Sequence, residues 1–499
     1  MSNLSELLPA GAGAKSASFV ASGTLASGQA VALKTDGTVE TIASVAQGVG
    51  AESVFEAATS NYARAIYDSN SNKVVIVYVD AGNSAAGTAI VGTVSGTSIS
   101  FGTPATFGAA GVTDLFVTFD STANKVVISY NLSGTGKSVV GTVSGTSISF
   151  GTAVVFNSAA AGYISSTFDS TNNKIVIGYR DQGNSNYGTA IVGTVSGTSI
   201  SFGTEVVFET ADTRNTVATF DSSNNKVVFA YSDAGNSNYG TAVVGTVSGT
   251  SISFGTAVVF ESAAVGNTIA TFDSTANKVV IGYEDAGNSY YGTAIVGTVS
   301  GTAISFGTAV VFNAAGTYYT ASTFDSNANK VIIAYNDAGN SNYGIAIAGT
   351  VSGTSISFGA ETVYNAAVTY YNAATFDSTN NKVVIGYRDA GNSNYGTAVV
   401  LTVASSNNTD FVGITDEAIA NTASGSVIVQ GGVGTGVSQP LTPVFGAESV
   451  FESAQSDFVT ATFDSNSNKV VIAYKDDANS SYGTAVVGTV SGTSISFGT

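Results

Sequence analysis

Short apolar runs separated by small polar residues recur along most of this chain. In residues 271–312 the runs are Lys278–Tyr283, Thr293–Val299 and Ile304–Phe312. Val, Ile, Thr, Phe and Tyr favour strands, whereas the Gly, Asn, Asp and Ser between the runs favour turns. Together with a strand that ends at Asp273, the segment predicts four strands, which we name A, B, C and D in chain order.

This four-stranded unit is repeated eight times. Each copy carries the motif Phe-Asp-Ser-x-x-Asn-Lys followed by apolar residues, with Tyr replacing Phe in the first copy. The aspartates of the motif are Asp68, Asp120, Asp169, Asp221, Asp273, Asp325, Asp377 and Asp464. Their spacings are 52, 49, 52, 52, 52, 52 and 87 residues. A fixed period indicates a repeat architecture in which each copy is one structural unit. Seven copies are contiguous, and the eighth follows an insertion.

Strand B indicates how the units pack. Its apolar residues are consecutive, as in Val279–Ile281, rather than alternating. A sheet with one face in water alternates, so both faces of each sheet are expected to be covered. Four-stranded antiparallel sheets stacked on both faces are typical of propeller blades. A solenoid is the alternative, although its repeats usually have about 20–45 residues.

The order of the strands predicts how the ring closes. A D-like strand, Glu52–Phe55, precedes the first strand A, and the last strand C, Thr397–Val403, has no D strand after it. We therefore expect residues 51–403 to form a seven-bladed β-propeller. Its first strand would complete the seventh blade and remove an open sheet edge.

The remaining segments predict two further parts. Residues 1–50 and 404–443 are each too short for a core of their own, and they predict one small β-domain into which the propeller is inserted. Residues 444–499 repeat the pattern, and Gly446–Glu452 is identical to Gly50–Glu56. We expect an eighth repeat that starts a second, truncated ring, in a fragment of a longer protein.

Composition excludes several chemistries. The chain has no Cys, His or Trp, so thiol nucleophiles, disulfides, Cys/His zinc sites and His-based triads are impossible. Any metal site must use oxygen ligands, which favours Ca²⁺. Only 10% of residues are charged, and the net charge of −18 disfavours nucleic acid and anionic membranes as partners. No apolar run is long enough for membrane insertion.

Two acidic turns in most repeats contain oxygen ligands that a cation could use. In the A–B turn, the motif aspartate is expected to accept hydrogen bonds from backbone N–H groups. The B–C loop reads Asp-Ala-Gly-Asn-Ser-x-Tyr-Gly in most copies and follows a residue that varies between Arg, Asn, Glu and Ser. A self-bonded loop is favoured there over Ca²⁺, and no cofactor is predicted.

The connection from strand D to strand A varies most between repeats, and it predicts a binding surface. In a propeller with strand A innermost, this connection lies near the channel mouth, and variable loops on a fixed frame are typical of recognition. Aromatic rings stack on sugar faces, and polar side chains satisfy sugar hydroxyls. The predicted ligand-binding residues are Tyr318, Tyr319, Tyr370 and Tyr371 at the core, with Tyr62, Arg64, Tyr163 and Arg214 around them. Drift in loops without a ligand, which would make the chain a purely structural spacer, is the alternative.

Catalysis is not expected. Propeller glycosidases need a carboxylate pair, or a Tyr nucleophile with clustered Arg. The chain has only four Arg residues, each in a different repeat, and no single repeat has a distinctive set of acids. A propeller glycoside hydrolase is therefore the least favoured function.

The flanking segments resemble a known group of proteins. Ser27–Val39, "SGQAVALKTDGTV", and Phe411–Val433, "FVGITDEAIANTASGSVIVQGGV", look like paired segments of structural proteins of tailed phages, chiefly marine ones. The resemblance implies an exposed virion component such as a tail fibre or receptor-binding adhesin. Its expected location is the virion surface, outside the cell. Its expected partners are host surface carbohydrate and other virion proteins, and a homo-oligomer is left open.

Overall fold

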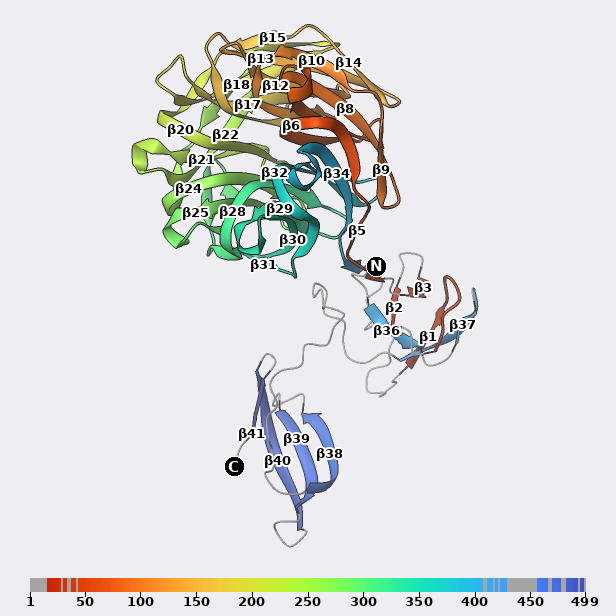
Figure 1. Cartoon of the computed structure of the whole chain (residues 1–499). Helices are drawn as coiled ribbons and strands as arrows, with labels where there is room; N and C mark the ends of the chain where they lie inside the picture. Colours follow the sequence, from red (N-terminus) through yellow and green to blue (C-terminus); the bar gives the residue numbers. More distant parts are fainter. Residues whose placement is uncertain are drawn as a thin grey trace. The chain divides into compact units, whose positions relative to one another are not determined.

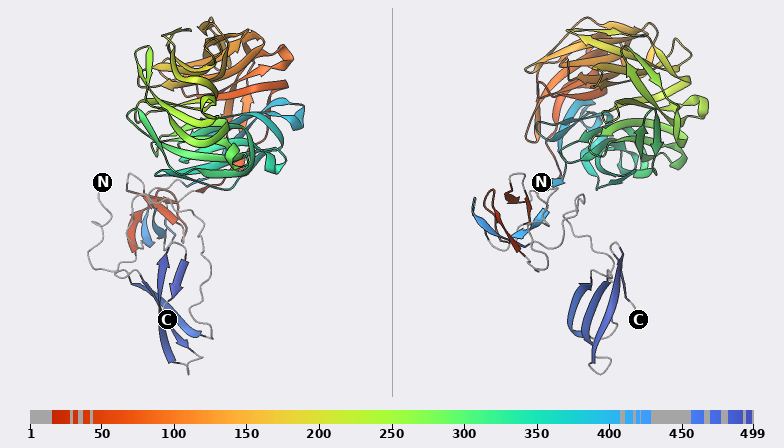
Figure 2. Two further views of the ribbon diagram at one scale, coloured as in Figure 1. Left: turned by 90° about the vertical axis from the view of Figure 1, so that its left-hand side faces the viewer. Right: turned by 180° about the vertical axis from the view of Figure 1, so that it is seen from behind.

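In the computed structural model the secondary structure of the chain is almost entirely β-strand. It describes residues 16–27, 30–33, 37–41, 44–406, 411–415, 418–420, 422–428, 456–464, 469–476, 482–491 and 494–497. The chain divides into two compact bodies, one of Ala43–Asn407 and one of Met1–Ile42 with Asn408–Thr499. Figures 1 and 2 show the larger body as a round array of sheets.

Strands B and C form the middle of seven consecutive sheets. The B strands are β7 (Lys73–Asp80), β12 (Lys125–Leu132), β17 (Lys174–Asp181), β21 (Lys226–Asp233), β25 (Lys278–Asp285), β29 (Lys330–Asp337) and β33 (Lys382–Asp389). The C strands are β8 (Ala86–Ser95), β13 (Thr135–Ser144), β18 (Tyr187–Ser196), β22 (Tyr239–Ser248), β26 (Tyr291–Ser300), β30 (Tyr343–Ser352) and β34 (Tyr395–Thr402). Each B strand pairs antiparallel with the C strand that follows it, as Val280 does with Val296.

Strand D is divided into two parts. Its first part is β9 (Ser98–Phe101), β14 (Ser147–Phe150), β19 (Ser199–Phe202), β23 (Ser251–Phe254), β27 (Ala303–Phe306) or β31 (Ser355–Phe358). After a short break the chain pairs with the other end of the same C strand.

The expectation of a loop between strands D and A is wrong at five junctions, where one long strand covers both. These strands are β6 (Ser53–Asp68), β20 (Val206–Asp221), β24 (Val258–Asp273), β28 (Val310–Asp325) and β32 (Thr362–Asp377). At the other two junctions that the structure describes, strand D is separate from strand A. These are β10 (Ala105–Ala110) with β11 (Val112–Asp120), and β15 (Val154–Asn157) with β16 (Ala161–Asp169). A long strand forms because its first half pairs with the strand C before it and its second half with the strand B after it.

A strand from the start of the repeats pairs with the last repeat, as predicted from the extra D-like strand that precedes the first strand A. The outer edge of β34 pairs with β5 (Gly48–Val49) and with the first half of β6, where Thr397 lies opposite Val54. Outside this pairing, β4 (Ser44–Val45) pairs with β35 (Ser405–Ser406). The inner strand A of each repeat contacts those of its two neighbours, including β6 with β32.

Contacts between the first and seventh repeats match those between other neighbours. Thr379 Oγ1 donates to Asn72 Oδ1 at 2.8 Å, and Thr122 Oγ1 donates to Asn173 Oδ1 at 2.6 Å between the second and third repeats. A Cβ atom on Gly50 would lie 1.7 Å from the carbonyl oxygen of Thr97, a close approach that recurs between later repeats. Gly is needed at this position because a side chain would collide with the neighbouring backbone.

The core lies between adjacent sheets. In β7 every residue from Val74 to Val79 is buried, as the consecutive apolar residues predict. One cluster joins Val74 and Ile76 to Val384 and Val400 of the seventh repeat. Burial of each such side chain contributes about 1.5–3 kcal/mol, so the cores between repeats are the main source of stability.

The acidic turns are bonded to their own backbone. Asp68 Oδ1 accepts hydrogen bonds from the N–H groups of Asn70 and Ser71, and the A–B turns of the next six repeats have the same bonds. The B–C loop contains a 3-10 turn in five repeats, η1 (Ala81–Asn83), η2 (Ala234–Asn236), η3 (Ala286–Asn288), η4 (Ala338–Asn340) and η5 (Ala390–Asn392). Asp233 caps η2 by accepting from the N–H groups of Gly235 and Asn236. These carboxylates therefore have a structural role.

The second body contains two separate sheets. One has the order β1 (Ser16–Val20), β37 (Ser424–Ile428), β36 (Phe411–Thr415), β2 (Ala30–Leu33) and β3 (Val39–Thr41), and so combines the segments on both sides of the repeats. The other contains the eighth repeat, with β38 (Ser456–Asp464), β39 (Lys469–Asp476), β40 (Tyr482–Ser491) and β41 (Ser494–Phe497). The duplicated segment 446–452 lies outside the described residues, and a second ring stays a prediction.

Candidate functional site

A β-bulge in every strand A positions the variable side chains. Beside β7, for example, the register shifts between Asn61 and Arg64. In the seven contiguous repeats the first residue of the bulge has a positive φ: Tyr62 (53°), Asp114 (44°), Tyr163 (48°), Asn215 (51°), Asn267 (45°), Tyr319 (51°) and Tyr371 (50°). Asn and Asp tolerate this conformation, but it is uncommon for a bulky residue such as Tyr. Strained positions of this kind concentrate at functional sites.

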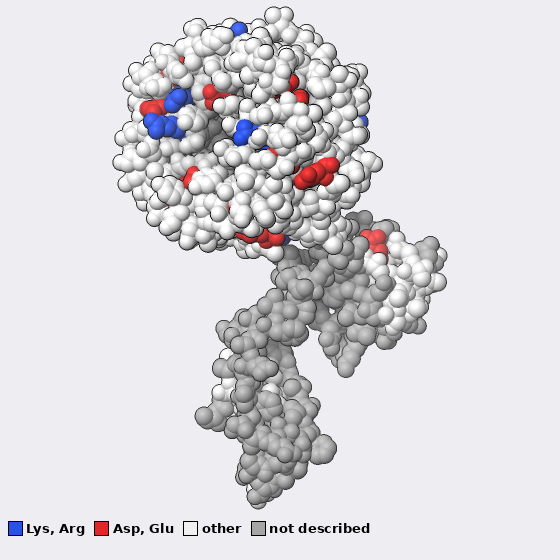
Figure 3. Space-filling model, in the orientation of Figure 1, with Lys and Arg blue, Asp and Glu red and all other residues white. Residues whose placement is uncertain are grey.

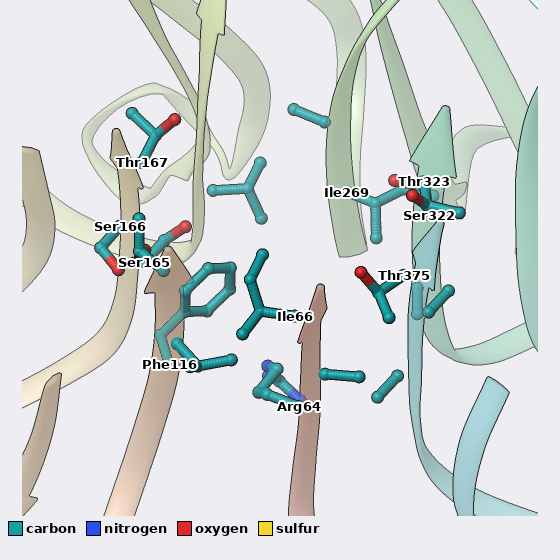
Figure 4. Close-up of a pocket in the computed structure, with 18 of the residues that line it drawn as sticks. Arg64, Ile66, Phe116, Ser165, Ser166, Thr167, Ile269, Ser322, Thr323 and Thr375 are labelled. Carbon is teal, nitrogen blue, oxygen red and sulfur yellow. Dashed lines mark hydrogen bonds between the residues drawn. The ribbon is translucent and has the colours of Figure 1, made fainter. Parts of the chain in front are cut away.

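These seven bulge residues line one cavity at the end of the array where strand A begins. The cavity, which we call the mouth, has a volume of about 280 Å³. It adjoins a deeper cavity of about 400 Å³, the channel, which is lined by strand A of all seven repeats. Figure 4 shows the channel, with Arg64 and Phe116 side by side at one end of it. Both residues line the mouth as well.

Four tyrosines make a continuous series of ring contacts at the mouth. The ring centroids of Tyr62 and Tyr371 are 5.0 Å apart, and those of Tyr371 and Tyr319 are 5.3 Å apart. Tyr370 continues the series, with its centroid 5.3 Å from that of Tyr319. Three repeats contribute to this aromatic cluster, and Tyr62 reaches it only because the first repeat lies beside the seventh.

Arg388 supports the aromatic cluster from strand B of the seventh repeat. Its guanidinium carbon lies 4.1 Å from the ring centroid of Tyr370 and 5.1 Å from that of Tyr371. Its Nη1 donates to Asn61 Oδ1 of the first repeat at 2.6 Å. A cation over an aromatic face is attracted by the ring quadrupole, so Arg388 helps to fix the orientation of both rings.

The other predicted residues lie outside the aromatic cluster. Tyr318, which is 37% exposed, lines a third cavity of about 500 Å³ that also contacts Tyr319 and Tyr370. Tyr163 lines the mouth two repeats away from Tyr62, and its ring centroid lies 5.0 Å from the guanidinium carbon of Arg180.

Arg214 is separate from the mouth. Its Nη2 lies 2.9 Å from Asp212 Oδ2, the Arg214 side chain is 47% exposed, and this side chain lines neither the mouth nor the channel. The structure thus brings together six of the eight predicted residues around the mouth and its edge, with Tyr163 on the far side. Tyr318 lies next to the cluster and Arg214 lies apart.

Burial changes the titration of the charged groups at the mouth. Desolvation lowers the pKa of Arg64, and the negative charge of Asp114 opposes this change. Desolvation raises the pKa of Asp114, opposed by a backbone hydrogen bond from Tyr163 and by the charges of Arg180 and Arg64. Burial also raises the pKa of Glu284, whose Oε2 accepts a hydrogen bond from Asn267 Nδ2 at 2.7 Å.

Sequence reasoning did not select several residues of this site, among them Arg388, Glu284 and Asn372. Arg388 and Glu284 occupy the variable position before the Asp of the B–C loop. This position pairs directly with a variable position of strand A, Arg388 with Tyr370 and Glu284 with Gly266. The variation of this strand B position between repeats therefore indicates that it belongs to the site. Asn372 carried no such signal, because its role depends on burial beside the bulge.

Charged side chains are sparse on the face seen in Figure 3, and Lys or Arg side chains lie on either side of a hollow there. Among the described residues, no group of three or more Asp or Glu side chains is placed to hold a metal ion. The part of the chain that the structure describes also contains no helix with the length and apolarity of a membrane span.

Comparisons with known proteins give distant structural similarity only. No family model matches the chain, and no curated protein sequence matches it. A structure described as NanB with Optactamide aligns with a TM-score of 0.43 at 11% identity, over 71% of this chain and 70% of the other. A protein of unknown function from Dyadobacter fermentans aligns with a TM-score of 0.43 at 11% identity, over 72% of this chain and 99% of the other.

The SapL1 lectin in complex with alpha methyl fucoside aligns with a TM-score of 0.37 at 12% identity, over 62% of this chain and 97% of the other. At these values, none of the three similarities assigns a ligand or an activity to this chain.

Proposed function

We propose that the seven repeats form a closed seven-bladed β-propeller whose mouth binds saccharides. The observation that carries this proposal is the aromatic cluster of Tyr62, Tyr319, Tyr370 and Tyr371 beside the mouth. Three of these tyrosines hold a backbone conformation that is unfavourable for their residue type, and all stand on a frame that is otherwise nearly identical from repeat to repeat.

The chemistry of the mouth suits sugars. Ring faces can stack on the apolar face of a pyranose, while amide and hydroxyl groups match its hydroxyls. The mouth supplies both kinds of group, since Asn215, Asn267, Thr216 and Thr268 line it together with the tyrosines. Bases could also stack on such rings, but a net charge of −18 would repel a nucleic acid.

The biological setting of the proposal rests on the resemblance of residues 27–39 and 411–433 to segments of tailed-phage structural proteins. In this proposal the chain is an exposed virion component, such as a tail-fibre or receptor-binding protein, that attaches to host surface glycans. Antibodies against residues 44–406 would label intact particles of a phage that encodes the chain. Particles that carry none of the protein would contradict this part of the proposal.

One observation favours hydrolysis as a second candidate function. Asp114 lines the mouth, and burial raises the pKa of its carboxyl group. A carboxyl with a raised pKa in a cleft is a candidate general acid. The expectation that the chain is not an enzyme is therefore tested directly, by measuring release of reducing sugar from a polysaccharide panel with the parent and with Asp114→Asn. Turnover that is lost in the variant would establish a hydrolase.

Binding is tested by replacing the tyrosines in a way that the backbone accepts. The triple variant Tyr62→Asn, Tyr319→Asn and Tyr371→Asn places at each bulge the residue that two other repeats already have there, Asn215 and Asn267. We expect the variant to fold normally and to lose at least about tenfold in affinity for the saccharides that the parent binds on a glycan array, since ring stacking is lost.

Tyr290→Asn is the matched control. Tyr290 is an exposed tyrosine with a φ of 62° in a B–C loop, where other repeats have Asn, and it lies outside the mouth. This variant should bind like the parent. Absence of binding to any glycan by the parent, or equal binding by the folded triple variant, would overturn the proposal.

A further inference from the structure

Arg64 is a cation held inside a cavity without a close carboxylate. Its side chain lines both the mouth and the channel. Its Nη1 donates to the carbonyl oxygen of Ala63 at 2.9 Å, and its guanidinium carbon lies 5.8 Å from the ring centroid of Phe116. Within the described ranges, none of its nitrogens lies within 4.0 Å of a carboxylate oxygen. Most of the guanidinium fork is thus available to a ligand.

Polar side chains with no partner lie on the same cavity wall. Asn372 is 2% exposed, and neither its Oδ1 nor its Nδ2 has a hydrogen-bond partner in the part of the chain that the structure describes. The same is true of the hydroxyl groups of Thr216 and Thr268, which are also buried. All three line the mouth, as Arg64 does. Buried polar groups in proteins are normally paired, so these unpaired atoms, which lie on a cavity wall, are available to a polar ligand in the mouth.

The positions of the Arg residues also favour an anionic ligand at the mouth. All four Arg residues, Arg64, Arg180, Arg214 and Arg388, lie in the part of strands A and B next to the mouth end. The repeated Lys of the Asn-Lys motif begins strand B at the opposite end, as Lys278 does. Arg presents a planar fork of donors that matches a carboxylate or a sulfate, whereas Lys is a point charge.

We propose that the mouth binds the anionic group of an acidic saccharide, a uronate carboxylate or a sulfate ester, with Arg64 as its cationic partner and Asn372, Thr216 and Thr268 as hydrogen-bond partners. This inference rests on the proposed saccharide binding and specifies the class of sugar. The tyrosines then hold the neutral part of the same ligand. Asp114 also lines the mouth, so the site suits a single anionic group better than a dense polyanion.

The test uses the full chain on an array of neutral, uronate-bearing and sulfated oligosaccharides. The best acidic ligand is then titrated calorimetrically beside its carboxyl-reduced or desulfated counterpart, which separates the carboxylate from the sulfate as the recognised group. Arg64→Gln should lower affinity for the acidic ligand about ten- to hundredfold, as expected for a lost charge-assisted hydrogen bond. Affinity for the neutral counterpart should change less than about twofold.

Two further variants keep the test decisive. Lys278→Gln makes the same charge change at the opposite end and should leave both affinities unchanged. Asn372→Ala should weaken the acidic ligand by about fivefold or more, and it provides an independent readout if Arg64→Gln folds poorly in a thermal melt.

The binding measurements distinguish failure of this inference from failure of the proposed function. Preference for acidic ligands that disappears in Arg64→Gln would support the inference. Binding of neutral ligands alone, or equal acidic binding by folded Arg64→Gln and Asn372→Ala, would overturn it and leave the proposed function standing. Absence of binding to every saccharide would overturn both.

Discussion

Arg388 and Tyr370 face each other across strands β33 and β32, with the guanidinium carbon 4.1 Å from the ring centroid. Both positions vary between repeats, and other repeats fill the same pair differently. Glu284 lies opposite Gly266, and Arg180 lies opposite Gly162, so a long side chain on strand B is matched there by the absence of one on strand A. These variable positions beside the mouth therefore differ between repeats as cross-strand pairs.

The first prediction concerns this pair. In a double-mutant cycle with Arg388→Gln and Tyr370→Leu, the coupling free energy of unfolding should be about 0.5–1.5 kcal/mol, because a half-buried cation over a ring is worth more than an exposed one. Chemical denaturation of the four proteins measures it. Additive effects of the two substitutions would show that the contact contributes nothing.

The second prediction concerns the junction of the first and seventh repeats. Gly50→Ala should destabilise the repeat array by about 1–3 kcal/mol, since the new Cβ would collide with the carbonyl oxygen of Thr97. Gly48→Ala is the control, because a Cβ there meets nothing within 4 Å. Equal melting temperatures for the two variants would mean that the junction is looser than the structure indicates.

The third prediction compares two buried asparagines. Asn336 Nδ2 donates to the carbonyl oxygens of Asn342 and Thr369, whereas neither side-chain atom of Asn372 has a partner among the described residues. Asn336→Ala should lower the free energy of unfolding by about 1–3 kcal/mol because it removes these bonds. Asn372→Ala should leave it unchanged or raise it, since no bond is lost. A larger loss in Asn372→Ala than in Asn336→Ala, measured by urea unfolding, would contradict this assignment.

The fourth prediction concerns pH. Burial raises the pKa of Glu284 in the folded state, so the folded protein binds this proton more tightly than the unfolded chain. The resulting stabilisation is fully present below the unfolded pKa of about 4.3 and is lost as the pH rises through the folded pKa. Glu284→Gln, which can still accept from Asn267, should therefore melt slightly higher than the parent at pH 7, by about 1 °C. The difference should disappear near pH 4, and a difference that stays constant with pH would rule out this cause.

Much of the repeat architecture could be predicted from sequence because each repeat carries its own local information. The consecutive apolar residues of β7 predict burial on both faces, and the offset between Glu52–Phe55 and the last strand C predicts their pairing in one sheet. Both features need only the order of residues along the chain and the spacing of the copies.

The site could be predicted only in part, because its geometry depends on pairing across strands and between repeats. Tyr62 contacts Tyr371 from the other end of the array, and no local pattern links the two. Tyr318 and Tyr319 are adjacent in sequence, yet the bulge gives Tyr319 a positive φ and places it at the mouth, while Tyr318 lines another cavity. A loop was expected where β28 is a continuous strand, because variation between repeats does not reveal that the first half of the segment pairs with β26 and the second half with β29.

The pairing of β4 with β35 and of β5 with β34 also has a mechanical consequence. The chain enters and leaves the repeat array through the same antiparallel pair, with Val45 opposite Ser405 and Val49 opposite Leu401. We call this paired region the seam. Tension applied between the flanking segments would pull its two strands apart from one end, so that their hydrogen bonds would break one after another. The first six repeats lie outside the path of the force, so a pulling experiment should record an early rupture at the seam before any repeat extends.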